Sequence, residues 1–201
     1  MSVKRGNSSI VVLGAWNPAI ITPAWLLQHK VFEVTSESPP IVLGQPGLPQ
    51  IRIGKVTLVA DFTKLIVQAE DGSDCGSFVA RILGLLPHTP IAAIGTNFLF
   101  ACAAEDLTPD RLPRLGNIQM TPHPSPADLK LIQTTWVRQM AEDAKLQISV
   151  TQQEGTDMVI GVNIHRDVTS ASRATEVAAT WADDRQASVA VLKEVFSVDI
   201  P

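Results

Sequence analysis

Hydrophobic and polar residues alternate in three stretches of the chain, over residues 56–62, 145–151 and 158–164. Successive side chains of a strand point to opposite faces, so this period is typical of strands with one buried face. A return strand over 64–70 completes one hairpin, and Glu154-Gly155 supplies the turn of another. The pattern therefore predicts one amphipathic hairpin in each half of the chain.

Longer apolar stretches predict strands in the interior of a sheet. Residues 9–16 form one of them. Ile91–Ala103 contains no charged residue and is expected to be a central strand, buried on both faces. Residues 128–140 leave two interpretations open, because apolar residues recur there at helical spacing, whereas Thr134-Thr135-Trp136-Val137 favours a strand. We expect a strand over this segment.

Helices are predicted from their caps and apolar stripes. Thr22 followed by Pro23 is typical of a helix start, and a short helix should extend to His29. Ser73 or Asp74 can cap a second helix. Its apolar stripe is Phe78, Val79, Ile82, Leu83 and Leu86.

The C-terminal part predicts one long helix. Ser172 is expected to open it, and a short strand over 195–200 is expected after it. The side chains expected to point inward are Ala174, Val177, Trp181, Leu192 and Phe196. Each half of the chain thus predicts a hairpin followed by a helix.

These elements predict an α+β fold with two similar ββα-type subdomains, mixed or antiparallel sheets, and helices packed on one face. We expect an N-terminal subdomain over 1–108, a Pro-rich linker over 109–126 and a C-terminal subdomain over 127–201. The linker contains five of the 14 prolines. Duplication is one explanation of the similarity, and the general frequency of ββα units is the other.

Composition and charge exclude some classes of function. The chain is 45% hydrophobic and 18% charged, with a net charge of −4, and its longest basic cluster is Lys4-Arg5. Nucleic-acid binding needs a concentrated basic surface, so a nucleic-acid partner is not expected. The uncharged stretch 10–28 superficially resembles a signal peptide, but Asn17-Pro18 and Thr22-Pro23 interrupt it. We expect a cytoplasmic protein with no membrane partner.

Two Gly-x-Asn steps are the first candidate site. Gly95 and Asn97 share one face of a predicted strand, as do Gly161, Asn163 and His165 on another. One interpretation is a polar notch in which the two asparagines and the histidine bind a ligand. The other is structural, with Asn97 bonded to a neighbouring loop backbone and Asn163 and His165 on a solvated sheet face.

Cys75 is the second candidate. A helix N-terminus lowers the pKa of a thiol, and His165 or His88 could serve as its base. The adjacent Asp74 opposes ionisation, so the alternative is an unreactive thiol in the first turn of the helix. Cys102 lies in an apolar strand and is expected in the core.

No metal or cofactor is predicted. The two cysteines and four histidines do not show the spacing of metal ligands, and phosphate-binding glycine loops are missing. The acidic residues Glu70, Asp71 and Asp74 cluster around one turn, and Asp183-Asp184 lies mid-helix. We interpret all of these carboxylates as solvated.

Three short stretches carry a resemblance to known sequences. They are His88-Thr89-Pro90-Ile91-x-x-Ile94-Gly95-Thr96-Asn97, Val162-Asn163-x-His165, and the opening from Asn17-Pro18 to Trp25. They resemble sporadically distributed, uncharacterised bacterial two-part α+β proteins of unknown function. The resemblance implies a bacterial or phage source and suggests a component of antiphage defence. It supplies no catalytic residues.

The sequence therefore favours a non-catalytic interaction or assembly protein that acts through self-association as a homo-oligomer or through a protein partner. One alternative is an enzyme whose site combines Asn97, Asn163, His165 and Cys75, which predicts a concave pocket where they converge. Another is an RNA-associated α+β module, which predicts exposed aromatic and arginine side chains on one sheet.

Overall fold

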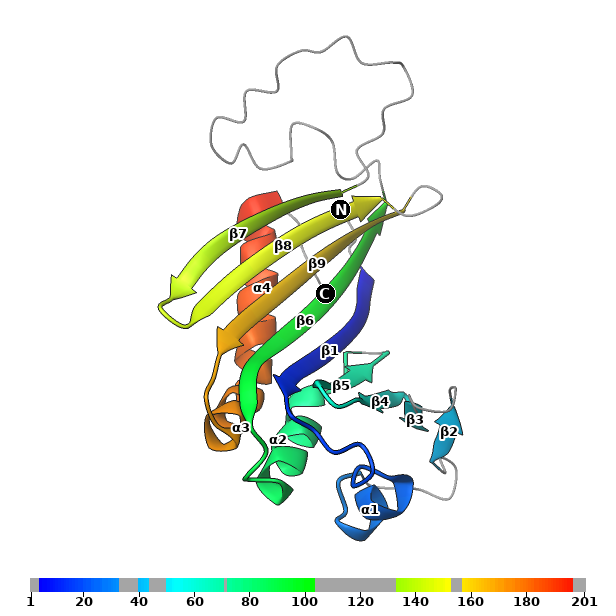
Figure 1. The fold of residues 1–201 in the computed structure, drawn as a ribbon. Helices are drawn as coiled ribbons and strands as arrows, with labels where there is room; N and C mark the ends of the chain where they lie inside the picture. Colours follow the sequence, from blue (N-terminus) through cyan, green and yellow to red (C-terminus); the bar gives the residue numbers. More distant parts are fainter. Residues whose placement is uncertain are drawn as a thin grey trace.

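The alternating segments of the chain assemble into one antiparallel sheet. In the computed structural model (Figure 1), which describes residues 4–32, 40–43, 50–70, 72–103, 133–152 and 157–196, nine strands and four helices are present in these ranges. The protein thus belongs to the α+β class, and its sheet order is β2-β3-β4-β5-β1-β6-β9-β8-β7.

Every neighbouring pair of strands runs antiparallel. The strands are β1 (Lys4–Gly14), β2 (Ile41–Leu43), β3 (Gln50–Ile53), β4 (Val56–Ala60), β5 (Lys64–Ala69), β6 (Ile91–Ala103), β7 (Gln133–Ala141), β8 (Ala144–Gln152) and β9 (Asp157–Asp167). The two predicted hairpins are confirmed as β4–β5 and β8–β9. The β6–β9 pair joins the strands of the predicted N-terminal subdomain to those of the C-terminal one.

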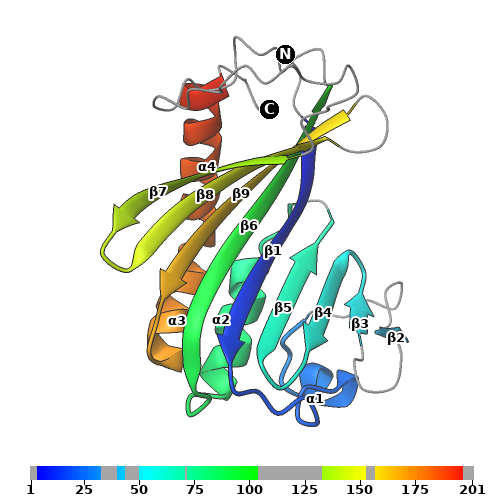
Figure 2. The same ribbon diagram turned by 45° about the horizontal axis from the view of Figure 1, so that its top comes forward.

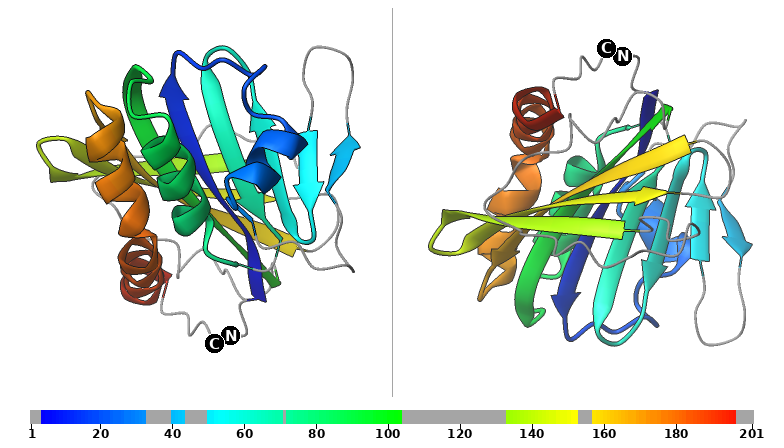
Figure 3. Two further views of the ribbon diagram at one scale, coloured as in Figure 1. Left: turned by 90° about the horizontal axis from the view of Figure 1, so that it is seen from below. Right: turned by 90° about the horizontal axis from the view of Figure 1, so that it is seen from above.

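Four helices lie on one side of this sheet (Figures 2 and 3). They are α1 (Pro23–Gln28), α2 (Cys75–Leu85), α3 (Ala171–Ala179) and α4 (Trp181–Phe196). Thr22 caps α1 and Asp74 caps α2, because their side chains accept backbone N–H bonds of the first turn. The prediction of helices on one face is confirmed.

The core fills the space between the helices and the sheet. On β8 and β9 the predicted inward residues are buried, from Leu146, Ile148 and Val150 to Ile160, Val162 and Ile164. All five predicted inward side chains of the last helical segment are buried as well. Alternation along the strands therefore identified the buried face correctly.

Two expectations about burial are wrong. β6 is central, but only its helix side is buried along its length, since Leu99 is 42% exposed on the other side, where Ala93 and Gly95 are buried. Phe62 does not extend the strand β4, and it lies in the β4–β5 turn with 75% of its surface exposed. The helices cover one face of the sheet, so the apolar length of β6 does not imply cover on both sides.

The long C-terminal helix is divided into two. Ser170, rather than Ser172, caps α3 by accepting a bond from the Arg173 amide, and the helix ends at Thr180 before α4 begins. Val195 lies within α4, and the remainder of the strand expected over 195–200 falls outside the described residues.

The segment 128–140 is a strand where it is described, because β7 covers Gln133–Ala141. The linker predicted over 109–126 lies outside the described residues. One sheet contains strands from both predicted subdomains, and the division at 108 and 127 remains a prediction.

Candidate interaction surface

The side of the sheet opposite the helices has no described element packed on it (Figure 1), and we call it the open face. Strand partners in register share a face. A row of partners therefore crosses the open face from β3 to β7. This central row is Arg52, Thr57, Gln68, Ser9, Asn97, Asn163, Gln147 and Val137.

The central row is mostly uncharged and polar. Its members between Thr57 and Gln147 carry only hydroxyl or amide side chains, each of which is half-buried or exposed. Eight strands at a spacing of about 4.8 Å make the row about 34 Å long along the sheet. That length is close to the roughly 32 Å width of a circular patch of about 800 Å², the size of one side of a standard protein interface.

Asn97 and Asn163 meet at the middle of this row. They are register partners on β6 and β9, and the Asn163 Nδ2 donates to the Asn97 Oδ1 at 2.7 Å. The structure therefore brings together the two asparagines of the candidate polar notch. The structural interpretation named the wrong partner, since Asn97 bonds a side chain and not a loop backbone.

The glycines of both Gly-x-Asn steps make room for neighbouring side chains. A Cβ at Gly95 would lie 3.1 Å from the Asn163 Nδ2, and a Cβ at Gly161 would lie 2.7 Å from the Ser149 Oγ. The Leu99 side chain also approaches the Gly161 position, at 3.6 Å. The glycines therefore let the asparagine pair and Leu99 lie flat on the sheet.

His165 lies beside the asparagine pair on the open face. It is the register partner of Gly95, and its side chain is 37% exposed. Its Nε2 lies 3.1 Å from the Oδ1 of Asp167, two residues along the same strand. The imidazole thus has a carboxylate neighbour, and its register partner on β8 is the exposed Lys145.

Charged side chains of the first half pair with each other toward the border of the open face. Arg52 donates to Glu70 at 2.9 Å, and Lys64 lies 3.9 Å from Asp61. The pKa of Asp61 is lowered, chiefly because the Thr63 hydroxyl donates to its carboxylate. The central row between Thr57 and Gln147 thus carries no charge, and the exposed Lys145 lies next to it as the register partner of His165.

Exposed aliphatic side chains complete the surface. Leu13 on β1 is 41% exposed, Leu99 on β6 is 42% exposed, and Val137 on the edge strand β7 is 65% exposed. By register, these three side chains lie on the open face. The surface therefore combines self-pairing polar groups with aliphatic groups.

Cys75 does not join this set. It is fully buried at the start of α2, on the helix side, where its Sγ lies 3.7 Å from both the hydroxyl and the carbonyl oxygen of Ser8. The structure therefore does not bring Cys75 together with the asparagines and His165. Cys102 is buried as expected.

One carboxylate was misjudged from the sequence. Asp184 is 3% exposed, and it accepts bonds from both terminal nitrogens of Arg166 at 2.7 and 2.5 Å and from the Thr96 hydroxyl at 2.8 Å. Its neighbour Asp183 is exposed, as expected. The Asp184 network lies on the helix side and fastens α4 to β6 and β9.

The other acidic residues have local roles. Glu70 pairs with Arg52, and Asp74 caps α2. Asp71 lies outside the described residues. Within the described ranges, no group of three or more His, Cys, Asp or Glu side chains is placed to hold a metal ion.

The chain has no match among known families. No protein-family description matches the sequence, and no curated protein matches it. Among the described helices, none is long and apolar enough to cross a membrane.

Proposed function

We propose that this is a non-catalytic interaction protein that assembles with a second copy of itself through the open face. The observation that carries the proposal is the composition of this face. Its centre holds the Asn97–Asn163 pair, a histidine and aliphatic groups, and charged pairs such as Arg52–Glu70 lie toward its border. Protein interfaces are likewise depleted of charge at the core and polar at the rim.

The side chains of the central row favour a second copy as the partner. Amide and hydroxyl groups such as those of Gln68, Ser9 and Gln147 both donate and accept hydrogen bonds. A two-fold contact places the same patch on both subunits, so the patch must pair with itself. Groups that donate and accept satisfy this condition, whereas a patch of one charge would repel its copy.

The enzyme alternative has less support. Its four residues do not meet in one pocket, since Cys75 lies beneath the sheet and the asparagines lie above it. The RNA alternative predicted exposed aromatic side chains on the sheet. No strand of the described ranges carries an aromatic side chain on the open face, and Phe98, Phe100 and Trp136 all face the helices.

Sedimentation velocity of the purified chain tests the proposal. A dimer at micromolar concentration is expected, and Leu99→Lys should shift it to monomer because a charge would enter the uncharged centre. Leu27→Lys is the matched control, since Leu27 is 39% exposed on α1 and lies away from the open face. A wild-type monomer, or equal effects of the two lysines, would contradict the proposal.

We further propose that the chain repeats one structural plan, with the second copy beginning at β6 and not at residue 127. Strands β1, β3, β4 and β5 then correspond to β6, β7, β8 and β9 in chain order, and α2 corresponds to α3. The buried polar residues Ser8 and Thr96 support the correspondence, since each precedes one of the register partners Ser9 and Asn97. Superposition of the Cα atoms of these elements in order tests it, and failure to align would contradict it.

A further inference from the structure

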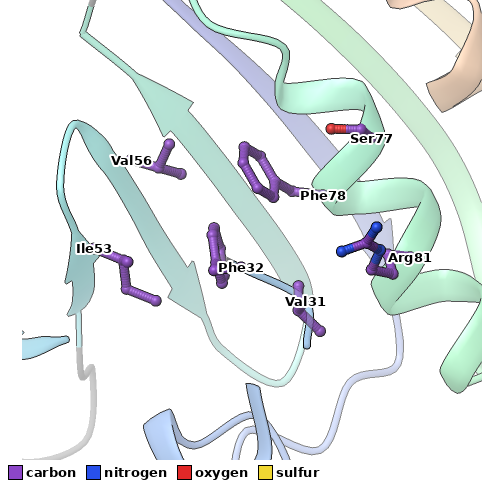
Figure 4. Close-up of a pocket in the computed structure, with 7 residues that line it drawn as sticks. All are labelled: Val31, Phe32, Ile53, Val56, Ser77, Phe78 and Arg81. Atoms are coloured by element: carbon purple, nitrogen blue, oxygen red, sulfur yellow. The ribbon is translucent and has the colours of Figure 1, made fainter. Parts of the chain in front are cut away.

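A pocket on the helix side of the molecule lies apart from the open face. It is formed where α2, the segment after α1 and the β3–β4 hairpin meet (Figure 4). Its volume is about 310 Å³, within the range of ligand sites, which begins near 300 Å³. The residues that line it are Val31, Phe32, Ile53, Val56, Ser77, Phe78 and Arg81.

Five of the seven lining residues are apolar. Phe32 and Phe78 stack with their ring centroids 4.6 Å apart, and Figure 4 shows the two rings facing one another. Ile53 and Val56 stand opposite α2 on the hairpin. Apolar walls that do not close on each other favour an apolar guest, because the guest replaces water against them.

The α2 wall of the pocket adds two polar groups. Ser77 and Arg81 are four residues apart on one helix and therefore lie on the same side of it. Figure 4 shows the Arg81 guanidinium beside the apolar residues. A guanidinium carries five N–H donors in a planar fork, which suits the two oxygens of a carboxylate.

The end of α1 fixes the position of Arg81. The Lys30 carbonyl accepts a bond from the Arg81 Nη1 at 2.6 Å. Lys30 has a left-handed φ of 52°, and its amide and that of Val31 bond back to α1 at the Leu27 and Leu26 carbonyls. No carboxylate of the described residues forms an ion pair with Arg81. The remaining donors of the fork can thus meet an anion from outside.

We propose that this pocket binds a small amphipathic carboxylate, a carboxyl group on a short aliphatic chain or a ring. The carboxylate pairs with the Arg81 guanidinium. The Ser77 hydroxyl, which donates to the Asp74 carbonyl oxygen at 3.4 Å in this structure, turns to donate to the carboxylate. The apolar part lies against the Phe32–Phe78 stack. The site is independent of the open face and of self-association.

Methyl NMR titration with octanoate tests this proposal. Saturable shifts are expected at the methyl groups of Val31, Ile53 and Val56, and octan-1-ol, which lacks the charge, should bind at least tenfold more weakly. Shifts spread over methyls elsewhere, equal binding of octanol, or no saturable shift at millimolar octanoate would overturn the proposal.

Variants of Arg81 distinguish a loss of octanoate binding caused by the missing charge from one caused by unfolding. Arg81→Gln should weaken octanoate binding at least tenfold, because a charge-assisted hydrogen bond is lost. Arg81→Lys, which keeps the charge, should retain part of the affinity. Arg173→Gln on α3 removes an equal charge at an exposed site and should leave binding unchanged. Equal weakening by Arg81→Gln and Arg173→Gln would overturn the role of Arg81, and the thermal unfolding midpoint of each variant verifies that it is folded.

Discussion

The Asn163 amide donates to the Asn97 amide oxygen at 2.7 Å across strands β6 and β9, on the face that the helices leave open. Gly95 makes this contact possible, because the Asn163 Nδ2 lies 3.1 Å from where its Cβ would be. The two asparagines therefore form one polar unit at the middle of the sheet.

A double-mutant cycle measures the strength of this unit. Asn97→Ala and Asn163→Ala should each destabilise the protein, and the two effects should couple by about 1 kcal/mol, the net value of one hydrogen bond. Denaturant unfolding of the four proteins provides the measurement. Asn97→Ala combined with Thr57→Ala, which lies three strands away, should be additive. Coupling indistinguishable from zero in the asparagine cycle would contradict the contact.

Gly76 fixes the approach of α2 to the end of α3. A Cβ there would collide with the Ala178 carbonyl oxygen and would lie 2.6 Å from the Trp181 Cβ. Gly76→Ala should therefore lower the free energy of unfolding by about 2 kcal/mol or more. Gly84 on the same helix has nothing within 4 Å of its Cβ position, so Gly84→Ala should raise it by about 0.5–1 kcal/mol. Similar values for the two variants would show that this packing is wrong.

Substitutions of Asp184 and of its neighbour Asp183 provide a second matched pair of variants. Asp184→Asn removes the charge that Arg166 faces in a nearly buried site, and should cost about 3 kcal/mol of unfolding free energy. Asp183→Asn changes an exposed carboxylate and should stay within about 0.5 kcal/mol of wild type. Urea unfolding at neutral pH distinguishes the two. A negligible cost at Asp184 would contradict the buried network.

The lowered pKa of Asp61 predicts that the free energy of unfolding falls in acid. Its pKa is lowered in the folded state, first by the Thr63 hydroxyl and then by the Thr63 amide. The resulting stabilisation is complete at a pH above the ordinary pKa of an aspartate, about 3.9. It is lost as the pH falls through the lowered pKa of the folded state. The stability difference between wild type and Asp61→Asn should therefore shrink only in acid. Thr63→Val should remove part of this pH dependence, and a difference that does not vary with pH would refute the assignment.

Local features of the fold could be predicted from the sequence. Alternation over 145–151 and 158–164 identifies the buried sides of β8 and β9, because strand side chains must alternate. Thr22 and Asp74 could be recognised as helix caps, because a cap depends only on a side-chain oxygen and the backbone N–H groups of the next few residues. The joining of both predicted subdomains into one sheet could not be predicted, since the β6–β9 register depends on contacts between distant segments.

In the candidate site, too, contacts between distant segments could not be predicted from the sequence. The Gly-x-Asn steps singled out Asn97 and Asn163, but their contact depends on the register of β6 with β9, which neither strand encodes alone. Asp184 was missed although a signal exists. Trp181, Asp184 and Ser188 follow each other at helical spacing on the buried side of α4, so the position of Asp184 already pointed inward.

Hydroxyl-radical footprinting of side chains at low and high protein concentration tests the central claim, that the open face joins two copies. If two copies join through this face, oxidation of Leu99 and Val137 slows as the concentration rises, while oxidation of Leu27 and Leu85 on the helices does not change. Protection of Leu27 or Leu85 instead, or rates at Leu99 and Val137 that do not depend on concentration, would contradict it.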